Sequence, residues 1–221
     1  MNREQQETIY YPVSLNLNGR KCLVVGGGQV ALRKVLSLLH HGAIIQLISP
    51  ELCPELEDMA KKNEITVVAR EYHPEDSDGA FMAIIATNNS KINREIANEA
   101  RKRLVLVNVV DDADYCDFIA PSYIRRGSIS ITISTSGKSP ALARKLRIKL
   151  EKEFGEEYAK LAYLLSDIRS EILEHNLNIS GEDWQEAIDL DLLIELLKNG
   201  EEGKARTAIL GKLKAKQQLE N

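Results

Sequence analysis

Residues 24–34 of the chain read Val24-Val25-Gly26-Gly27-Gly28-Gln29-Val30-Ala31-Leu32-Arg33-Lys34. The short apolar run at 21–25, which leads into the glycines, has the composition of a buried β-strand. After the glycines, apolar residues recur at helical spacing from Ala31 to Leu39. The sequence therefore predicts a strand, a tight glycine turn and a helix in immediate succession.

The glycine turn has the spacing of a dinucleotide-binding loop. Gly26 and Gly28 occupy the first two glycine positions of a G-x-G-x-x-G/A pattern, and Ala31 occupies the last. Such a turn lets the backbone approach a pyrophosphate, which the free N–H groups and the positive end of the following helix attract. Three glycines alone are equally compatible with an ordinary loop. Their position between a strand and a helix favours the dinucleotide site.

Short apolar strands alternate with helical patterns through the first half of the chain. This order predicts parallel βαβ units, and hence an α/β fold with a Rossmann-like doubly wound parallel sheet. Ligands of such sheets lie beyond the carboxyl ends of the strands, where Thr87, Asn88 and Asp111 follow two of the expected strands. We expect strands at 21–25, 44–48, 65–69, 81–86 and 104–109, with further helices at 54–62 and 90–103.

The pattern changes in the second half of the chain. Residues 118–120 and 128–134 flank Arg125-Arg126-Gly127 like an antiparallel pair of strands. Ser180 and Asp183 have the spacing of a helix-capping pair. We expect helices at 140–153, 156–175, 182–198 and 202–217. Within them we expect a helical core stripe of Trp184, Ile188, Leu190, Leu193 and Leu197.

Composition excludes several classes of protein. The 221 residues include 29 Lys and Arg against 33 Asp and Glu, a net charge of -4 that argues against general nucleic-acid binding. The N-terminus, 1–6, is polar, and no apolar run approaches the ~20 residues of a membrane span, so we expect a cytoplasmic protein without a membrane partner. Cys22, Cys53 and Cys116 lie far apart, which indicates neither a disulfide framework nor a structural zinc site.

One interval of this acidic chain is strongly basic. Between Asp117 and Glu151 there is no carboxylate, and hydroxyl residues and a glycine at 134–139 precede an expected helix that begins at Pro140. Cations and helix N–H groups together would attract a polyanionic small ligand. The alternative, that the cations form a solvated helix face balanced by acids elsewhere, stays open. The cations of this basic patch are Arg125, Arg126, Lys138, Arg144, Lys145, Arg147 and Lys149.

Four ordered blocks resemble one family. They are 24–34, Ala86-Thr87-Asn88, 107–112 and Ser136-Gly137-Lys138-Ser139-Pro140-Ala141-Leu142-Ala143-Arg144. Together they resemble the precorrin-2 dehydrogenase/sirohydrochlorin ferrochelatase family of sirohaem synthesis, over roughly residues 10 to 165. The resemblance implies NAD-dependent oxidation of precorrin-2 to sirohydrochlorin on a homodimer. In some members Fe²⁺ or Co²⁺ insertion follows. The resemblance does not extend to the methyltransferase domain of the fused sirohaem synthases, so we expect none in these residues.

The resemblance also implies roles for individual residues. Asp111 is the catalytic acid-base residue, although the interpretation of 111–117 as a solvated acidic turn stays open. No residue is assigned to a stable metal site. Ser49 stands where simple fingerprints have an acid, so the choice of NAD over NADP rests on the resemblance. The cofactor-binding residues are Gly26, Gly28, Gln29 and Val30 at the pyrophosphate, Pro50 and Glu51 by the ribose, and Thr87 and Asn88 in the crevice. The residues expected to bind substrate carboxylates are Thr135, Ser136, Lys138, Ser139 and Arg144.

We therefore expect three parts. These are an NAD-binding Rossmann domain at 1–113, a small α+β dimerisation and substrate segment at 114–152, and a C-terminal helical domain at 153–221. Two other functions stay open: an NAD-sensing regulatory module and a tetrapyrrole carrier without turnover. Neither alternative would oxidise a tetrapyrrole.

Overall fold

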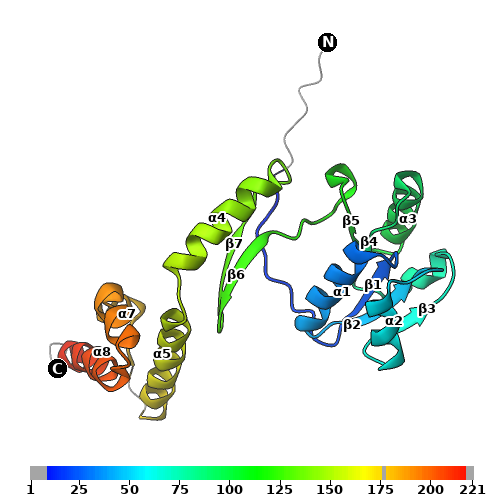
Figure 1. Ribbon diagram of the computed structural model, residues 1–221. Coiled ribbons are helices and arrows are strands. Elements are labelled where there is room, and N and C mark those ends of the chain that lie inside the picture. Colours follow the sequence, from blue (N-terminus) through cyan, green and yellow to red (C-terminus); the bar gives the residue numbers. More distant parts are fainter. Residues whose placement is uncertain (1–8, 176–177, 218–221) are drawn as a thin grey trace. The chain divides into compact units, whose positions relative to one another are not determined.

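The computed structural model describes residues 9–175 and 178–217 and divides into two compact units, Met1–Ala120 and Pro121–Asn221 (Figure 1). The expectation for the polar segment 1–6 lies outside the described residues. The division into three functional parts stays a prediction. Along the described chain, no helix combines the length and the apolar composition that crossing a membrane requires.

The first unit is built on a five-stranded parallel sheet of order β3-β2-β1-β4-β5, which confirms the predicted fold class. The strand order reverses between β1 and β4, so the segments that leave these two strands run to opposite sides of the sheet. A crevice is expected between them at the carboxyl ends of β1 and β4. Its strands are β1 (Lys21–Val25), β2 (Ile44–Ile48), β3 (Thr66–Val68), β4 (Met82–Ile85) and β5 (Leu106–Val109). Its helices are α1 (Gln29–His40), α2 (Pro54–Lys61) and α3 (Ser90–Lys102), with short 3-10 turns η1 (Pro74–Ser77) and η2 (Ala113–Tyr115).

Helices cover both faces of this sheet, as a doubly wound fold requires. Along β1, Cys22 and Val24 pack with α1 and α2 in one apolar cluster, whereas Leu23 and Val25 pack with α3 in another. Successive strand residues point to opposite faces, so a continuous apolar run such as 22–25 can be buried on both sides. The run therefore lies at the centre of the unit, and the glycine turn follows directly at its carboxyl end.

The second unit begins with a hairpin that differs from the expected one. β6 (Ser122–Arg126) pairs antiparallel with β7 (Ile129–Ile133), so the prediction of a strand at 118–120 was wrong. Phe118 instead belongs to the first unit, where it packs against the core and its carbonyl accepts a hydrogen bond from Asn108 Nδ2 at 2.9 Å. Arg125 and Arg126 are consequently strand residues, and the turn lies at Gly127, whose φ is +56°.

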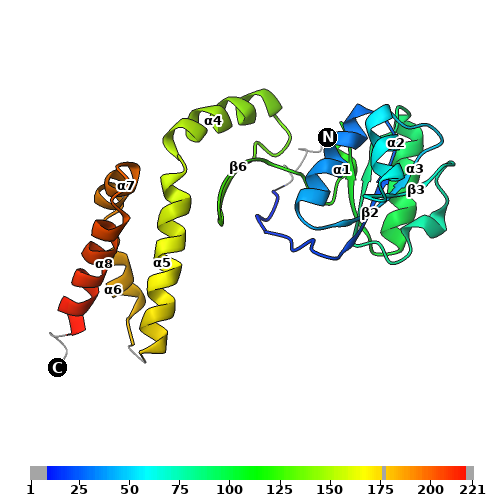
Figure 2. The same cartoon turned by 60° about the horizontal axis from the view of Figure 1, so that its bottom comes forward.

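The hairpin is followed by α4 (Pro140–Glu153), α5 (Glu157–Glu174), α6 (Gly181–Ala187), α7 (Leu190–Lys198) and α8 (Glu202–Gln217). The single helix expected at 182–198 is in fact two, because the Asp189 side chain caps a new helix by accepting from Leu192 N at 3.3 Å. The predicted capping pair is present, since Ser180 Oγ accepts from Asp183 N at 3.1 Å. Figures 1 and 2 show α5, α7 and α8 packed side by side.

This bundle has its own apolar core. Leu193 and Leu197 are each 1% exposed, and Trp184 and Ile188 are partly buried against the same cluster. Leu190 is 47% exposed, so its assignment to the core was wrong. The physical reason is the break at Asp189. The helical spacing predicts which residues share a face only within one continuous helix, and Leu190 begins a second helix.

Candidate dinucleotide site

The glycine turn is held between the ends of two strands. Gly26 has a φ of +118°, a conformation that residues with a side chain rarely adopt, and its N–H donates to Ile48 O at 2.9 Å. A Cβ at Gly26 would stand 2.5 Å from Ala86 O, immediately beyond β4. The backbone must therefore lack a side chain here to pass between β2 and β4.

Gly27 supports the turn from the other side. A Cβ at this position would lie 1.9 Å from Glu51 O, and Gly27 O accepts a hydrogen bond from Cys53 N at 2.8 Å. Ser49 Oγ donates to Glu51 O at 2.7 Å and shapes the same loop. In the G-x-G-x-x-G/A pattern, the position of Gly27 can be any residue. Here a glycine is required because the loop at 49–53 approaches the turn too closely for a side chain.

Gly28 has a different environment, which is the one expected of a ligand-facing residue. It caps α1 in an extended conformation without a side-chain hydrogen bond, and a Cβ added to it would meet no protein atom within 4 Å. The first turn of α1 contains no acidic residue. Its N–H groups thus face open space at the positive end of the helix, where an anionic phosphate binds favourably.

All eight residues predicted to bind the cofactor line one cavity of about 590 Å³. Their roles as cofactor contacts stay predictions. The cavity also has walls that sequence reasoning did not include, namely Gly27, Ser49, Leu52, Cys53, Glu71 and Ala86. The predicted liners are Gly26, Gly28, Gln29 and Val30 from the turn and α1, Pro50 and Glu51 after β2, and Thr87 and Asn88 after β4.

The charge of this cavity is negative. Of its described liners only Glu51 and Glu71 are charged, and both are exposed acids. Glu71 follows β3 by three residues, so only the sheet order brings it beside the loop after β2. Two carboxylates without a lysine or arginine among the liners suit ribose hydroxyls better than a ribose phosphate.

The loop after β4 is fixed by side-chain hydrogen bonds. Thr87 Oγ1 donates to Asn93 Oδ1 at 2.5 Å, and Asn93 Nδ2 donates back to Thr87 O at 3.1 Å. Asn89 caps α3 by accepting from Lys91 N at 3.0 Å and Ile92 N at 3.2 Å. Thr87 therefore holds the wall of the cavity in place, and Asn88 between these anchors is exposed.

Asp111 differs from Asp112 and Asp117, the two acids of its loop that form ion pairs. Asp112 pairs with Arg94 at 2.9 Å, and Asp117 pairs with Arg101 at 2.8 Å while accepting from Val107 N at 2.9 Å. Asp111 is exposed, has a φ of +61°, and receives no hydrogen bond or ion pair from the part of the chain that the structure describes. The acidic turn thus consists of two ion-paired carboxylates and two exposed ones, of which Asp111 lies just beyond the carboxyl end of β5 and Asp114 lies in η2.

Lys34 on α1 is a functional candidate that sequence reasoning did not identify. Burial lowers the pKa of the Lys34 ammonium, and the nearby Arg33 lowers it further, whereas Cys116 and Asp111 act in the opposite direction. Lys34 is therefore a partly buried cation whose pKa is set mainly by burial, with Asp111 as a minor influence. Its position in the glycine-turn motif was visible in the sequence, but its proximity to the loop after β5 required the fold.

The segment predicted to bind substrate lies in the second unit. Thr135 Oγ1 accepts from Ser139 N at 3.0 Å, and Ser139 Oγ accepts from Leu142 N at 3.3 Å, so both hydroxyls build the N-terminus of α4. Ser136 has a φ of +51°. Lys138 and Arg144 are exposed.

The basic patch is partly neutralised within its own unit. Arg147 pairs with Glu151 at 2.7 Å, and Arg126 pairs with Glu156 at 3.3 Å. For these two residues the alternative of a locally balanced surface is the better description. Arg144, Lys145 and Lys149 are exposed and form no ion pair with described residues, which leaves a smaller positive surface on α4.

The three thiols provide a test of the cavity. We expect iodoacetamide at about pH 8 to alkylate Cys53 first, because Cys53 is half-buried and lines the cavity. Burial raises the pKa of Cys22 to about 11, and burial also raises the pKa of Cys116, whose thiol donates to Val109 O at 3.2 Å. Peptide mass spectrometry should show that NAD slows labelling of Cys53 alone. Labelling at the same rate with saturating NAD would mean that the dinucleotide lies elsewhere.

Two family models match the chain. Residues 13–122 match one described as NAD(P)-binding, and residues 126–153 match the central part of a sirohaem biosynthesis protein. The siroheme synthase of Chromobacterium violaceum is 36% identical over 199 residues, which make up 89% of this chain and 42% of the relative. That of Photorhabdus laumondii is 46% identical over 142 residues, which make up 64% of this chain and 30% of the relative.

A solved structure shares the fold. SirC, named as a precorrin-2 dehydrogenase, is 28% identical and superposes with a TM-score of 0.68, covering 93% of this chain and 100% of its own. The siroheme synthases are much longer, since this chain spans less than half of their length. The matches confirm the predicted use of a nicotinamide dinucleotide.

Proposed function

The chain belongs to the precorrin-2 dehydrogenase family of sirohaem synthesis, and on this premise we propose that it oxidises precorrin-2 to sirohydrochlorin with NAD. The observation that carries the proposal is the single cavity in which all eight expected cofactor residues meet at the carboxyl edge of the sheet. A cavity at this edge, beside an uncapped helix N-terminus, supports cofactor binding by the first unit.

The oxidation removes one hydride and one proton from the macrocycle. Bound NAD supplies the hydride acceptor. We propose that the Asp111 carboxylate accepts the proton, because it lies just beyond β5 and no described residue forms an ion pair with it. Thr87 and Asn93 keep the neighbouring wall rigid.

We propose NAD rather than NADP as the cofactor. Glu51 and Glu71 bring two negative charges to the side of the cavity formed by the loops after β2 and β3. Either carboxylate can accept hydrogen bonds from ribose hydroxyls, and both repel a 2′-phosphate. Ser49, at the usual position of the acid, instead holds the Glu51 loop through its hydrogen bond to Glu51 O.

We propose that the basic patch on α4 captures the substrate, with Thr135, Ser136, Lys138, Ser139 and Arg144 as the contacting segment. Precorrin-2 carries eight carboxylates, so exposed cations on α4 complement it. Arg144→Glu should weaken substrate capture about tenfold at low salt and much less at high salt, because exposed charges are screened. KM measured against ionic strength tests this. The control Lys160→Glu reverses an exposed charge on α5 and should leave KM unchanged.

We propose a homodimer formed through the hairpin and α4. A two-stranded sheet is marginally stable by itself, and α4 exposes Leu142, Leu146 and Ile148 by 49%, 39% and 41%. Light scattering should report about twice the 24.7 kDa of one chain. Leu146→Glu should yield monomers, whereas Leu190→Glu, at an exposed apolar residue on α7, should not. A monomeric wild-type protein would exclude the dimer.

The direct test is an anaerobic incubation with freshly generated precorrin-2 and either NAD or NADP. A joint rise in sirohydrochlorin and reduced nicotinamide, faster with NAD, supports the proposal. Binding of NAD without either signal would favour the sensor or the carrier. Adding Fe²⁺ or Co²⁺ afterwards tests metal insertion, in which Asp111 would also accept the pyrrole protons. We place the reaction in the cytoplasm, where the three unpaired cysteines would remain reduced.

A further inference from the structure

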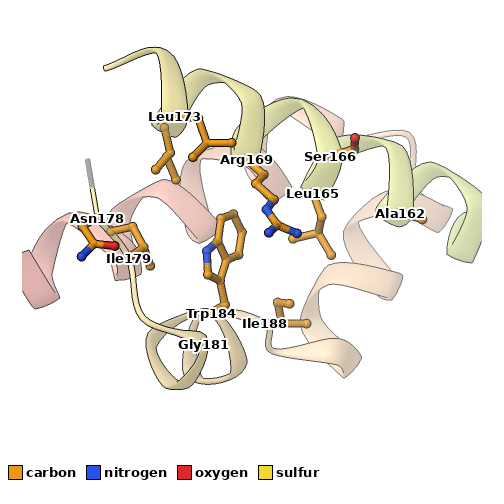
Figure 3. A pocket seen from close by; sticks show the side chains of 11 residues that line it. Ala162, Leu165, Ser166, Arg169, Leu173, Asn178, Ile179, Gly181, Trp184 and Ile188 are labelled. Carbon is orange, nitrogen blue, oxygen red and sulfur yellow. The ribbon is translucent and has the colours of Figure 1, made fainter. Parts of the chain in front are cut away.

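The C-terminal bundle contains a cavity of about 690 Å³ that shares no lining residue with the dinucleotide cavity. Residues of α5 form one wall, and residues 178–188 form the other. Figure 3 shows the Trp184 ring rising from α6 toward α5, with the Arg169 side chain extending from α5 beside it. The volume lies within the range of about 300–1,000 Å³ that is typical of small-molecule sites.

The lining is apolar except for one cation. Leu165 and Leu173 stand one turn before and one turn after Arg169 on α5, so the arginine lies in the middle of an apolar stripe. Among the described liners Arg169 is the sole charged residue, and no described carboxylate pairs with it. The neighbouring Leu173 is 65% exposed. A lone guanidinium between two apolar side chains, of which Leu165 is partly buried and Leu173 exposed, is the arrangement expected around an amphipathic anion.

We propose that this cavity binds a small monocarboxylate with an aromatic or apolar body, its carboxylate on Arg169 and its body against Trp184. A guanidinium fork binds a carboxylate with two parallel hydrogen bonds, and the indole offers a large flat apolar surface. Asn178 and Ser166 at the wall can orient the same group. The site extends the function of the chain beyond the oxidation proposed above and does not depend on it.

The charge around the cavity selects against polyanions. Asp167 and Glu174 on α5 and Glu182 and Glu186 on α6 lie outside the lining, whereas Arg169 alone is positive within it. One cation in an otherwise uncharged lining suits a ligand with a single negative charge. A tetrapyrrole with eight carboxylates, or a dinucleotide with a pyrophosphate, would have negative charges that this lining does not pair.

Trp184 is the single tryptophan of the chain, so its fluorescence reports on this cavity directly. We would titrate the full chain, saturated with NAD, with 4-phenylbutyrate and, as a neutral probe of the same body, with 4-phenylbutanamide. Saturable quenching is expected, with the amide binding about five- to tenfold more weakly because it lacks the charge-assisted pair. Arg169→Gln should weaken the binding of 4-phenylbutyrate by the same factor, and Arg169→Lys should weaken it by about two- to threefold.

The matched control is Lys160→Gln, which removes an exposed cation from the same helix outside the lining. It should leave the affinity unchanged, and circular dichroism should show the Arg169 and Lys160 variants folded, because both side chains are exposed. Calorimetry with Trp184→Phe should show weaker binding independently of fluorescence. Absence of saturation, equal affinity for acid and amide, or insensitivity to Arg169→Gln would each overturn the proposal.

Discussion

Asp111→Asn is expected to lower turnover of precorrin-2 by about 10²- to 10⁴-fold, the usual contribution of a general base, while leaving the affinity for NAD unchanged. Asparagine has the same shape and tolerates the left-handed conformation at this position, where φ is +61°. The substitution therefore removes the charge without straining the loop. Asp111→Ala should lose turnover to the same extent, with a small additional loss of stability because alanine disfavours positive φ.

The measurement is kcat and KM for precorrin-2 alongside the dissociation constant for NAD. Asp114→Asn is the control, because Asp114 is an exposed acid of the same loop. Turnover should fall in Asp111→Asn and stay unchanged in Asp114→Asn, since only the former removes the proposed proton acceptor. Full activity in Asp111→Asn would remove the assigned role and favour a carrier that holds its substrate without turning it over.

Gly28→Ala is expected to weaken NAD binding without a loss of stability, whereas Gly27→Ala is expected to destabilise the fold. A Cβ at Gly28 meets no protein atom within 4 Å, so the variant should unfold in urea like the wild type. The same Cβ occupies the space where a pyrophosphate would approach the first turn of α1, and NAD affinity should fall about 30- to 100-fold. Calorimetry for binding and urea titration for stability separate the two quantities.

Gly27→Ala should instead destabilise the fold. Its Cβ would lie 1.9 Å from the backbone oxygen of Glu51, and neither backbone can move without breaking the Gly27–Cys53 hydrogen bond. We expect a loss of about 3 kcal/mol in the free energy of unfolding, at the upper end of overpacking effects. A stable Gly27→Ala protein, or a Gly28→Ala protein that binds NAD normally, would contradict this account of the turn.

Local patterns in the sequence were sufficient to predict most of the first unit. The apolar runs at 21–25 and 44–48, the glycine spacing and the helical periods predict elements that the structure contains within one or two residues. They succeed because strand burial and helix periodicity depend on residues close together in the chain. They failed at 118–120 and at Asp189, where a contact with Asn108 and a capping hydrogen bond decided the boundary.

By itself, the sequence determined the elements, their order and the chemistry that the glycine turn and the exposed acids can offer. Only the tertiary structure decided that Glu71 and Cys53 line the dinucleotide cavity, that Lys34 is partly buried, and that Arg169 and Trp184 line one cavity. It also decided that Gly27 cannot carry a side chain. The physical reason is that these relations join segments distant in the chain, whose separation is set by strand order and helix packing and leaves no periodic trace in the sequence.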